Sequence, residues 1–202
     1  MPAATDRERT LKLARRRGGV AARDLAEAGI HRQVLSRLVA EGKLERIARG
    51  LYRLRDQPFT EHHALSIVGT AVPQGVVCLI SALQFHKIGT QIPYKVWVAI
   101  DRRARTPALK YPPLRVVRYT GEALAAGVEN HRIEGQLVRV YNVPRTIADC
   151  FKYRNKIGLE VALEALREAW RARRFTIDEL DRYAAICRVQ RVMRPYLEAL
   201  VG

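Results

Sequence analysis

The chain has 202 residues, of which 48% are hydrophobic and 7% aromatic, a composition typical of a globular protein with a core rather than of a disordered one. Its 36 Lys and Arg residues against 20 Asp and Glu give a formal net charge of +16, which favours a polyanionic partner such as nucleic acid. The longest apolar runs are too short to span a bilayer, and the first residues contain no apolar signal segment. We therefore expect a cytoplasmic protein without membrane contact.

The basic excess extends along the whole chain. Residues 1–60 carry a net charge of +7, residues 61–143 of +5 and residues 144–202 of +4, so the excess is densest at the N-terminus. An Arg-rich proteome would raise all three values without any nucleic-acid partner. Contact with nucleic acid is favoured because the densest region also contains a recognisable motif.

That motif begins with two short helices, predicted over residues 5–17 and 21–28. Gly29 ends the second helix, and a short turn that contains Gly between two helices is typical of a helix-turn-helix. A third helix begins near His31 and ends at Gly42. Two strands follow, over residues 44–47 and 51–54, joined by Ala48-Arg49-Gly50. Three helices and a β-hairpin of this size predict a winged helix-turn-helix, whose second motif helix enters the DNA major groove.

The third helix has one apolar stripe and one polar face. The stripe consists of Val34, Leu35, Leu38 and Val39, at the spacing of a 3.6-residue period. Arg and Gln at the start of such a helix can bond purine edges, and Arg on a wing can enter the minor groove or bind phosphate. The predicted DNA-binding residues are His31, Arg32, Gln33, Ser36 and Arg37 on the helix, and Arg46, Arg49 and Arg53 on or near the wing. The alternative to DNA contact is that these side chains are only solvated at the surface, and this alternative is strongest for Arg37 and Arg53.

After a linker over residues 56–59, the apolar pattern predicts both helices and strands. Apolar runs predict a helix over residues 61–70, a strand near Val76, and a helix over residues 81–87 capped by Ser81. Further strands are expected over residues 95–100, 114–119 and 136–141, whereas residues 124–133 are ambiguous. From Pro144 onward the pattern is helical. The predicted fold class is α+β, with a winged helix-turn-helix domain over residues 1–56 and a mixed α+β domain with a helical C-terminal part over residues 60–202.

Catalytic and metal-binding patterns are weak. Cys78, Cys150 and Cys187 are far apart in apolar contexts, so we expect buried, reduced thiols and no metal or cofactor. No Gly-rich phosphate loop is present, and the five acidic residues between positions 61 and 143 form no nuclease-like pair. Asp149 lies on an otherwise apolar helical face beside Arg145, which predicts a buried, hydrogen-bonded group. A catalytic role would require a second carboxylate brought near by folding. We expect a protein that is not an enzyme.

Two segments carry a resemblance to a known family. Residues 19–54, and above all the hairpin pattern of Leu44, Arg46, Ile47, Gly50, Leu51, Tyr52 and Leu54, resemble the winged-helix domain of AbiEi antitoxins of bacterial type IV toxin–antitoxin systems. The segment from Pro144 to Phe151, followed by Lys156-Ile157-Gly158, is similar to the C-terminal domain of that family.

The resemblance implies a repressor that binds inverted repeats in its own promoter. It also implies that the second domain counters a nucleotidyltransferase-like toxin without forming a stable complex with it. Since one winged helix reads only a short half-site, we expect paired binding, as monomers or a weak dimer. Two alternatives remain: a winged-helix regulator without a toxin partner, and a basic protein that binds or processes nucleic acid.

Overall fold

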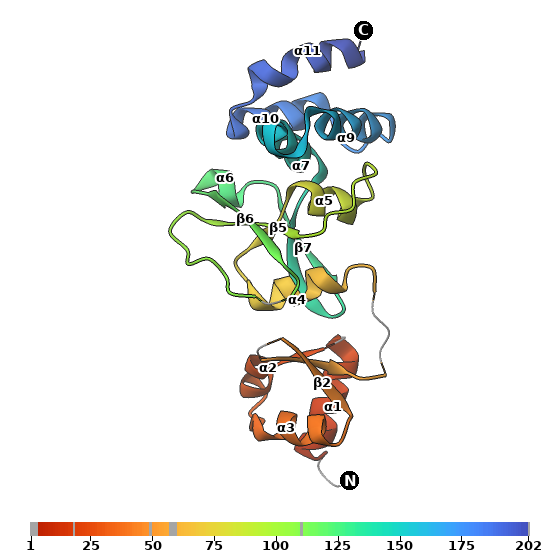
Figure 1. Cartoon of the computed structure of the whole chain (residues 1–202), viewed down its shortest axis with the longest axis vertical. Helices are drawn as coiled ribbons and strands as arrows, with labels where there is room; N and C mark the ends of the chain where they lie inside the picture. The colour runs from red at the N-terminus through yellow and green to blue at the C-terminus, as the bar shows by residue number, and fades with distance from the viewer. Residues whose placement is uncertain (1–3, 18, 49, 57–59, 110, 202) are drawn as a thin grey trace. The chain divides into compact units, whose positions relative to one another are not determined.

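The computed structural model describes residues 4–17, 19–48, 50–56, 60–109 and 111–201 (Figure 1). The chain divides into two compact units. Unit 1 comprises Met1–Pro73, Pro107–Pro112 and His131–Val138, and unit 2 comprises Gln74–Thr106, Pro113–Asn130 and Arg139–Gly202. None of the described helices is long and apolar enough to cross a membrane.

Unit 1 begins with the predicted helices and hairpin. The helices are α1 (Asp6–Arg17), α2 (Ala22–Glu27) and α3 (Gln33–Ala40), and the strands are β1 (Val20–Ala21), β2 (Leu44–Ala48) and β3 (Leu51–Leu54). The strands form an antiparallel sheet in the order β1-β3-β2. Strand β1 was not predicted, because two residues are too few to show alternation. Its pairing with β3 ties the start of α2 to the wing.

The core of this N-terminal part follows the apolar spacing of α3. Leu35 and Leu38 are almost fully buried and pack with Leu25 of α2 and Leu44 of β2. The prediction was wrong for Val39, which is 36% exposed and does not belong to this core cluster. Leu35 and Leu38, about one turn apart, therefore define the face of α3 that points into the core.

Helix α4 (His63–Ala71) also belongs to unit 1. Its Ile67 packs with Ala21 of β1 and Leu51 of β3. Gly69 is required where α4 meets residues 137–138, because a Cβ atom there would lie 2.6 Å from the Leu137 carbonyl oxygen. The polypeptide after the wing is thus packed against the wing itself.

A mixed five-stranded sheet follows in the chain. Its strands are β4 (Val76–Val77), β5 (Val96–Asp101), β6 (Leu114–Tyr119), β7 (Val128–Ile133) and β8 (Gln136–Tyr141), in the order β6-β5-β4-β8-β7. Strand β4 pairs antiparallel with β5 and parallel with β8, while β5 and β6 are parallel. The segment that was ambiguous in sequence contains helix α6 (Glu122–Ala125) and strand β7.

The remaining helices are α5 (Leu79–His86), α7 (Val143–Lys152), α8 (Arg154–Ile157), α9 (Leu159–Arg171), α10 (Ile177–Cys187) and α11 (Gln190–Val201). Within unit 2, α7, α9 and α10 gather on one side of the sheet in Figure 1. The α+β class, with a winged helix-turn-helix at its start, is confirmed. The expected Ser81 cap was wrong, since α5 begins two residues earlier. The Ser81 hydroxyl instead accepts a hydrogen bond from the Trp97 amide at 3.0 Å.

Helix α7 supplies the centre of the unit 2 core. Ile147, Ala148 and Phe151 are fully buried and pack with apolar residues of the sheet and of α9 and α10. The Asn142 side chain caps α7 by accepting from the Arg145 amide at 3.0 Å. Asp149 is fully buried and hydrogen-bonded, as predicted. The three cysteines are likewise buried and unpaired as disulfides.

Candidate nucleic-acid interface

The candidate interface is the polar face of α3. Because Leu35 and Leu38 hold the opposite face in the core, the side chains between them point outward. All five residues predicted on this helix are exposed: His31, Arg32, Gln33, Ser36 and Arg37. Arg32 and Ser36 lie one turn apart, as do Gln33 and Arg37, so these four form two adjacent rows of hydrogen-bonding groups, and His31 precedes them.

The start of α3 is fixed by a local hydrogen bond. The Gln33 amide donates to Nδ1 of His31 at 3.3 Å, which satisfies one of the amides left open at a helix N-terminus. An accepting Nδ1 places the imidazole proton of the neutral ring on Nε2. His31 therefore satisfies the first amide of the helix, whereas the side chain of the N-cap residue Arg32 makes no capping hydrogen bond.

Three of the predicted residues line one pocket of about 450 Å³ between α3 and the start of α1. These are His31, Gln33 and Arg37, and Asp6 and Arg7 of α1 line its other side. Arg7 donates through Nε and Nη2 to one oxygen of Glu41, at 3.2 and 3.0 Å, and so joins α1 to the end of α3. The pocket thus has a fixed wall next to the exposed donors.

The wing residues have different positions. Arg46 is exposed on β2, where it lies opposite Tyr52. Arg49 lies outside the described residues. Arg53 does not fit the expected surface contact, because it is only 7% exposed and its Nε pairs with Oε1 of Glu45. Glu45 is its direct cross-strand neighbour, so the hairpin register holds the Arg53 guanidinium against the sheet.

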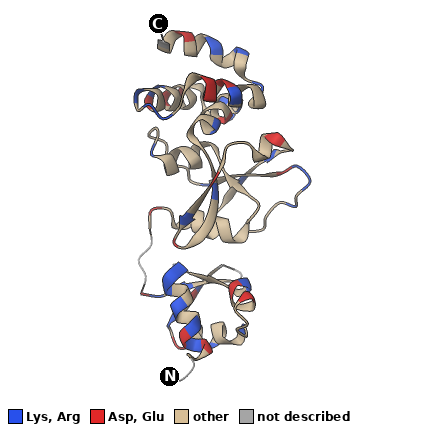
Figure 2. Cartoon of the chain, turned by 180° about the vertical axis from the view of Figure 1, so that it is seen from behind, with Lys and Arg blue, Asp and Glu red and all other residues tan. Residues whose placement is uncertain are grey.

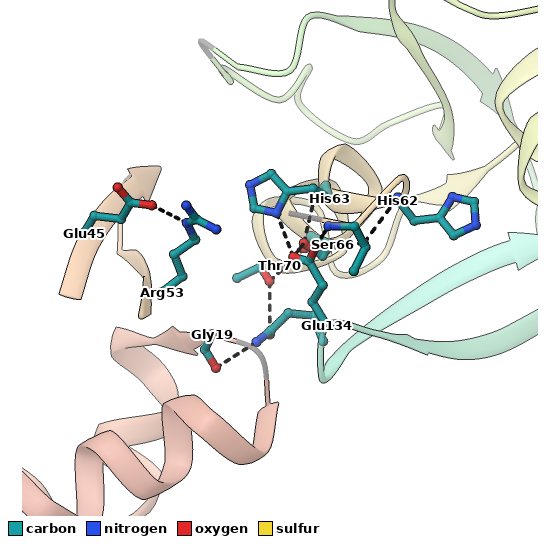
Figure 3. Close-up of polar contacts among 10 residues, drawn as sticks. Gly19, Glu45, Arg53, His62, His63, Ser66, Thr70 and Glu134 are labelled. Carbon is teal, nitrogen blue, oxygen red and sulfur yellow. Dashed lines mark hydrogen bonds and ion pairs between the residues drawn. The ribbon is translucent and has the colours of Figure 1, made fainter. Parts of the chain in front are cut away.

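The Glu134–Gln136 turn makes a second group of polar contacts in unit 1 (Figure 3). The Glu134 carboxylate accepts from the Thr60 amide at 3.0 Å and from the Ser66 hydroxyl at 3.0 Å, and lies 2.7 Å from Nδ1 of His63. Burial raises the Glu134 pKa, but the hydrogen bonds from His63 and Thr60 more than offset this, so the pKa is lower than usual. The ionised carboxylate therefore holds the start of α4.

The same turn reaches the helix-turn-helix. Gln136 Nε2 donates to the Gly19 carbonyl at 3.2 Å, and Gln136 Oε1 accepts from the Thr70 hydroxyl at 3.1 Å (Figure 3). Gly135 has φ +73° and lies so near the Arg17 carbonyl that a Cβ atom would overlap it. Contacts across more than a hundred residues leave no local sequence signal, so they were not predicted.

Asp24 is a further residue that the sequence analysis missed. Its Oδ2 accepts from the Ala21 amide at 2.8 Å, and its Oδ1 lies 3.1 Å from Arg17 Nη1. The carboxylate therefore satisfies the start of α2 although the residue before the helix is alanine. An Asp three residues after a cap position is the signal that could have predicted this contact.

Basic residues occur throughout the chain, with a run of them along the N-terminal helix (Figure 2).

The comparison with known protein families concerns the same N-terminal part of the chain. Residues 8–55 match the family described as transcriptional regulator, AbiEi antitoxin. This match confirms the AbiEi resemblance over the segment that contains most of α1, together with α2, α3 and the wing. No protein of curated function matches the chain. The AbiEi match thus covers the helix-turn-helix and every predicted DNA-binding residue.

Proposed function

We propose that this protein is a DNA-binding antitoxin of a type IV system and the repressor of its own operon. The single observation that carries the proposal is the row of exposed donors on α3, inside the segment that matches AbiEi transcriptional regulators. The proposal assigns residues 1–56 to DNA binding and residues 60–202 to antitoxin activity, without catalysis or a cofactor, in the cytoplasm.

In this proposal α3 enters the major groove. Arg32 and Gln33 are at its N-terminal end, where recognition helices of this motif contact base edges, and Arg bonds guanine while Gln bonds adenine. His31, Ser36 and Arg37 contact bases or adjacent phosphates. Arg46 on the wing contacts phosphate or the minor groove. The proposal does not assign a DNA contact to Arg53, since its side chain is buried and paired with Glu45.

Two copies would occupy one operator. A single recognition helix reads a few base pairs, which is too few to select one promoter, so specificity requires two half-sites. We therefore propose that monomers or a weak dimer bind an inverted repeat in the promoter of the operon. The partner that residues 60–202 oppose is a nucleotidyltransferase-like toxin, and no stable complex forms between the two proteins.

DNase footprinting on the DNA upstream of its own gene tests the repressor part. We expect two protected segments related by an inverted repeat, and loss of both with Arg32→Ala/Gln33→Ala. Lys12→Ala, which removes an exposed charge from α1, is the matched control and keeps the protection. Equal protection by the double variant would overturn the assignment of the recognition helix.

Co-expression tests the antitoxin part. A neighbouring gene that encodes a nucleotidyltransferase should arrest growth alone and become harmless with this protein, including the Arg32→Ala/Gln33→Ala variant. Protection of the upstream DNA without rescue of growth would instead support a winged-helix regulator that has no toxin partner. Metal-dependent cleavage of nucleic acid by the purified protein would support an enzyme.

A further inference from the structure

Unit 2 contains a basic pocket of about 680 Å³ that the proposed DNA contact does not use. It lies among the ends of β5 and β6, helix α6, and the C-terminal ends of α7 and α10. Four cationic residues line it, namely Arg102, Arg118, Lys152 and Arg188. Glu122 is the one acidic residue in its lining, so the lining has three more positive than negative side chains.

The Arg118 guanidinium fixes one wall. Its Nη1 donates to the carbonyl oxygens of Arg102 at 2.9 Å and Ala104 at 2.8 Å, and its Nη2 donates to the Thr106 hydroxyl at 2.9 Å. The loop after β5 is therefore closed around this side chain, and Arg102 is held on it. Figure 2 shows basic residues along this loop.

The opposite wall is also ordered. Lys152 Nζ lies 4.8 Å from the centre of the Tyr119 ring, a cation–π contact that holds the ammonium group at the pocket. Arg188 follows α10 with φ +60°, in the left-handed conformation that ends the helix. The four cations thus come from four separate segments that the fold brings together.

The buried carboxylate nearby interacts first with Arg145 and only to a lesser extent with Lys152. Asp149 lies 3.2 Å from Arg145 Nη2 and accepts from the Tyr119 hydroxyl at 2.8 Å, so its charge is already balanced inside the core. Among the described residues, no carboxylate pairs with the guanidinium of Arg102 or Arg188. The four cations outnumber the Glu122 carboxylate in the lining, so they repel one another, and a bound anion relieves that repulsion.

The size of the pocket suggests the class of anion. Small-molecule sites measure about 300–1,000 Å³, whereas a DNA duplex lays its phosphates along an open surface. A single phosphate would leave most of the 680 Å³ unfilled. The walls also include Ala123, Ala185 and Ile186, which offer apolar contact to a sugar or base. We propose that this pocket binds a free nucleotide, with its phosphates on the four cations.

Calorimetric titration of the full chain tests the proposal, with ATP, GTP, CTP, UTP and inorganic pyrophosphate as separate ligands. We expect saturable one-to-one binding of at least one nucleotide, more tightly than pyrophosphate. Lys152→Gln and Arg188→Gln should each weaken it about tenfold, since each removes one charge-assisted contact. Arg167→Gln, an equal charge change at an exposed site of α9, should leave it unchanged.

Three results would overturn the proposal. One is the absence of saturable binding for every nucleotide, and another is an equal loss of nucleotide affinity in the Arg167→Gln control. The third is pyrophosphate binding as tightly as every nucleotide, which would reduce the pocket to a phosphate site. A competition with a DNA duplex adds a further criterion. If the duplex displaces the nucleotide and both pocket variants weaken duplex binding, the pocket belongs to a DNA surface instead.

Discussion

Arg145 and Asp149 lie one turn apart on α7, and the side chains of both are fully buried. Arg145 Nη2 is 3.2 Å from Asp149 Oδ1, and the guanidinium lies 4.7 Å from the centre of the Tyr141 ring. Arg145 Nη2 also donates to the Ala123 carbonyl at 2.6 Å. This pair therefore links α7 to the sheet and to α6.

Removal of one partner should destabilise the protein strongly. We expect Arg145→Met to lower the free energy of unfolding by about 3–5 kcal/mol, because the Asp149 charge is then buried without its cation. Urea unfolding followed by circular dichroism measures this. Arg145→Met/Asp149→Leu should recover part of the loss, and Arg167→Met is the exposed control. A single variant as stable as the wild type would contradict the structural role of the pair.

Glu134 should make stability depend on pH. Its pKa is lower than usual in the folded state because hydrogen bonds offset its burial, so its contribution is present above the unfolded pKa of about 4.3. That contribution is lost as the pH falls through the folded pKa. Glu134→Gln should therefore lower the free energy of unfolding at pH 7 by about 1–3 kcal/mol. At pH 3 the difference in free energy of unfolding between variant and wild type should be smaller. An equal difference at both pH values would exclude the ionised Glu134 carboxylate as its origin.

The three cysteines should be unreactive in the folded protein. Burial raises the pKa of the Cys78, Cys150 and Cys187 thiols, so the reactive thiolate is scarce and inaccessible. We expect an aromatic disulfide reagent to label the native protein very slowly and all three thiols in denaturant. Fast labelling of a native thiol would show that part of the unit 2 core opens readily.

Substitution of Arg53 should affect stability, whereas substitution of Arg32 should affect DNA affinity. Arg53→Ala leaves Glu45 without its cross-strand partner and should lower the free energy of unfolding by about 1–3 kcal/mol, with unchanged DNA affinity of the folded protein. Arg32→Ala removes an exposed side chain and should weaken DNA binding while stability stays within about 0.5 kcal/mol. Thermal unfolding and DNA titration of both variants separate these effects; a loss of affinity in Arg53→Ala without a loss of stability would place Arg53 on the DNA.

Local patterns in the sequence predicted most helices and strands. The apolar spacing of Leu35 and Leu38 and the Gly-containing turns were sufficient for the helix-turn-helix and hairpin, since these elements depend on neighbouring residues. Buried Asp149 was predicted for the same reason, because its partner Arg145 is four residues away. Strand β1 was too short to show a pattern.

Contacts between distant residues could not be predicted from one sequence. Glu134 and His63 are 71 residues apart, and Arg102, Lys152 and Arg188 converge only in the folded chain. The burial of Arg53 depends on the hairpin register, which places it opposite Glu45 rather than toward solvent. Charge alone does not distinguish an exposed arginine from one paired across a sheet.

The most direct test of the central claim is a DNA titration at several salt concentrations, followed by fluorescence anisotropy of the labelled upstream region. We predict that affinity falls steeply with salt, as expected for several phosphate contacts, and that Arg32→Ala/Gln33→Ala weakens binding at least about tenfold. Lys12→Ala should bind almost like the wild type. Equal affinity of the double variant and the wild type at every salt concentration would contradict the proposed role of α3.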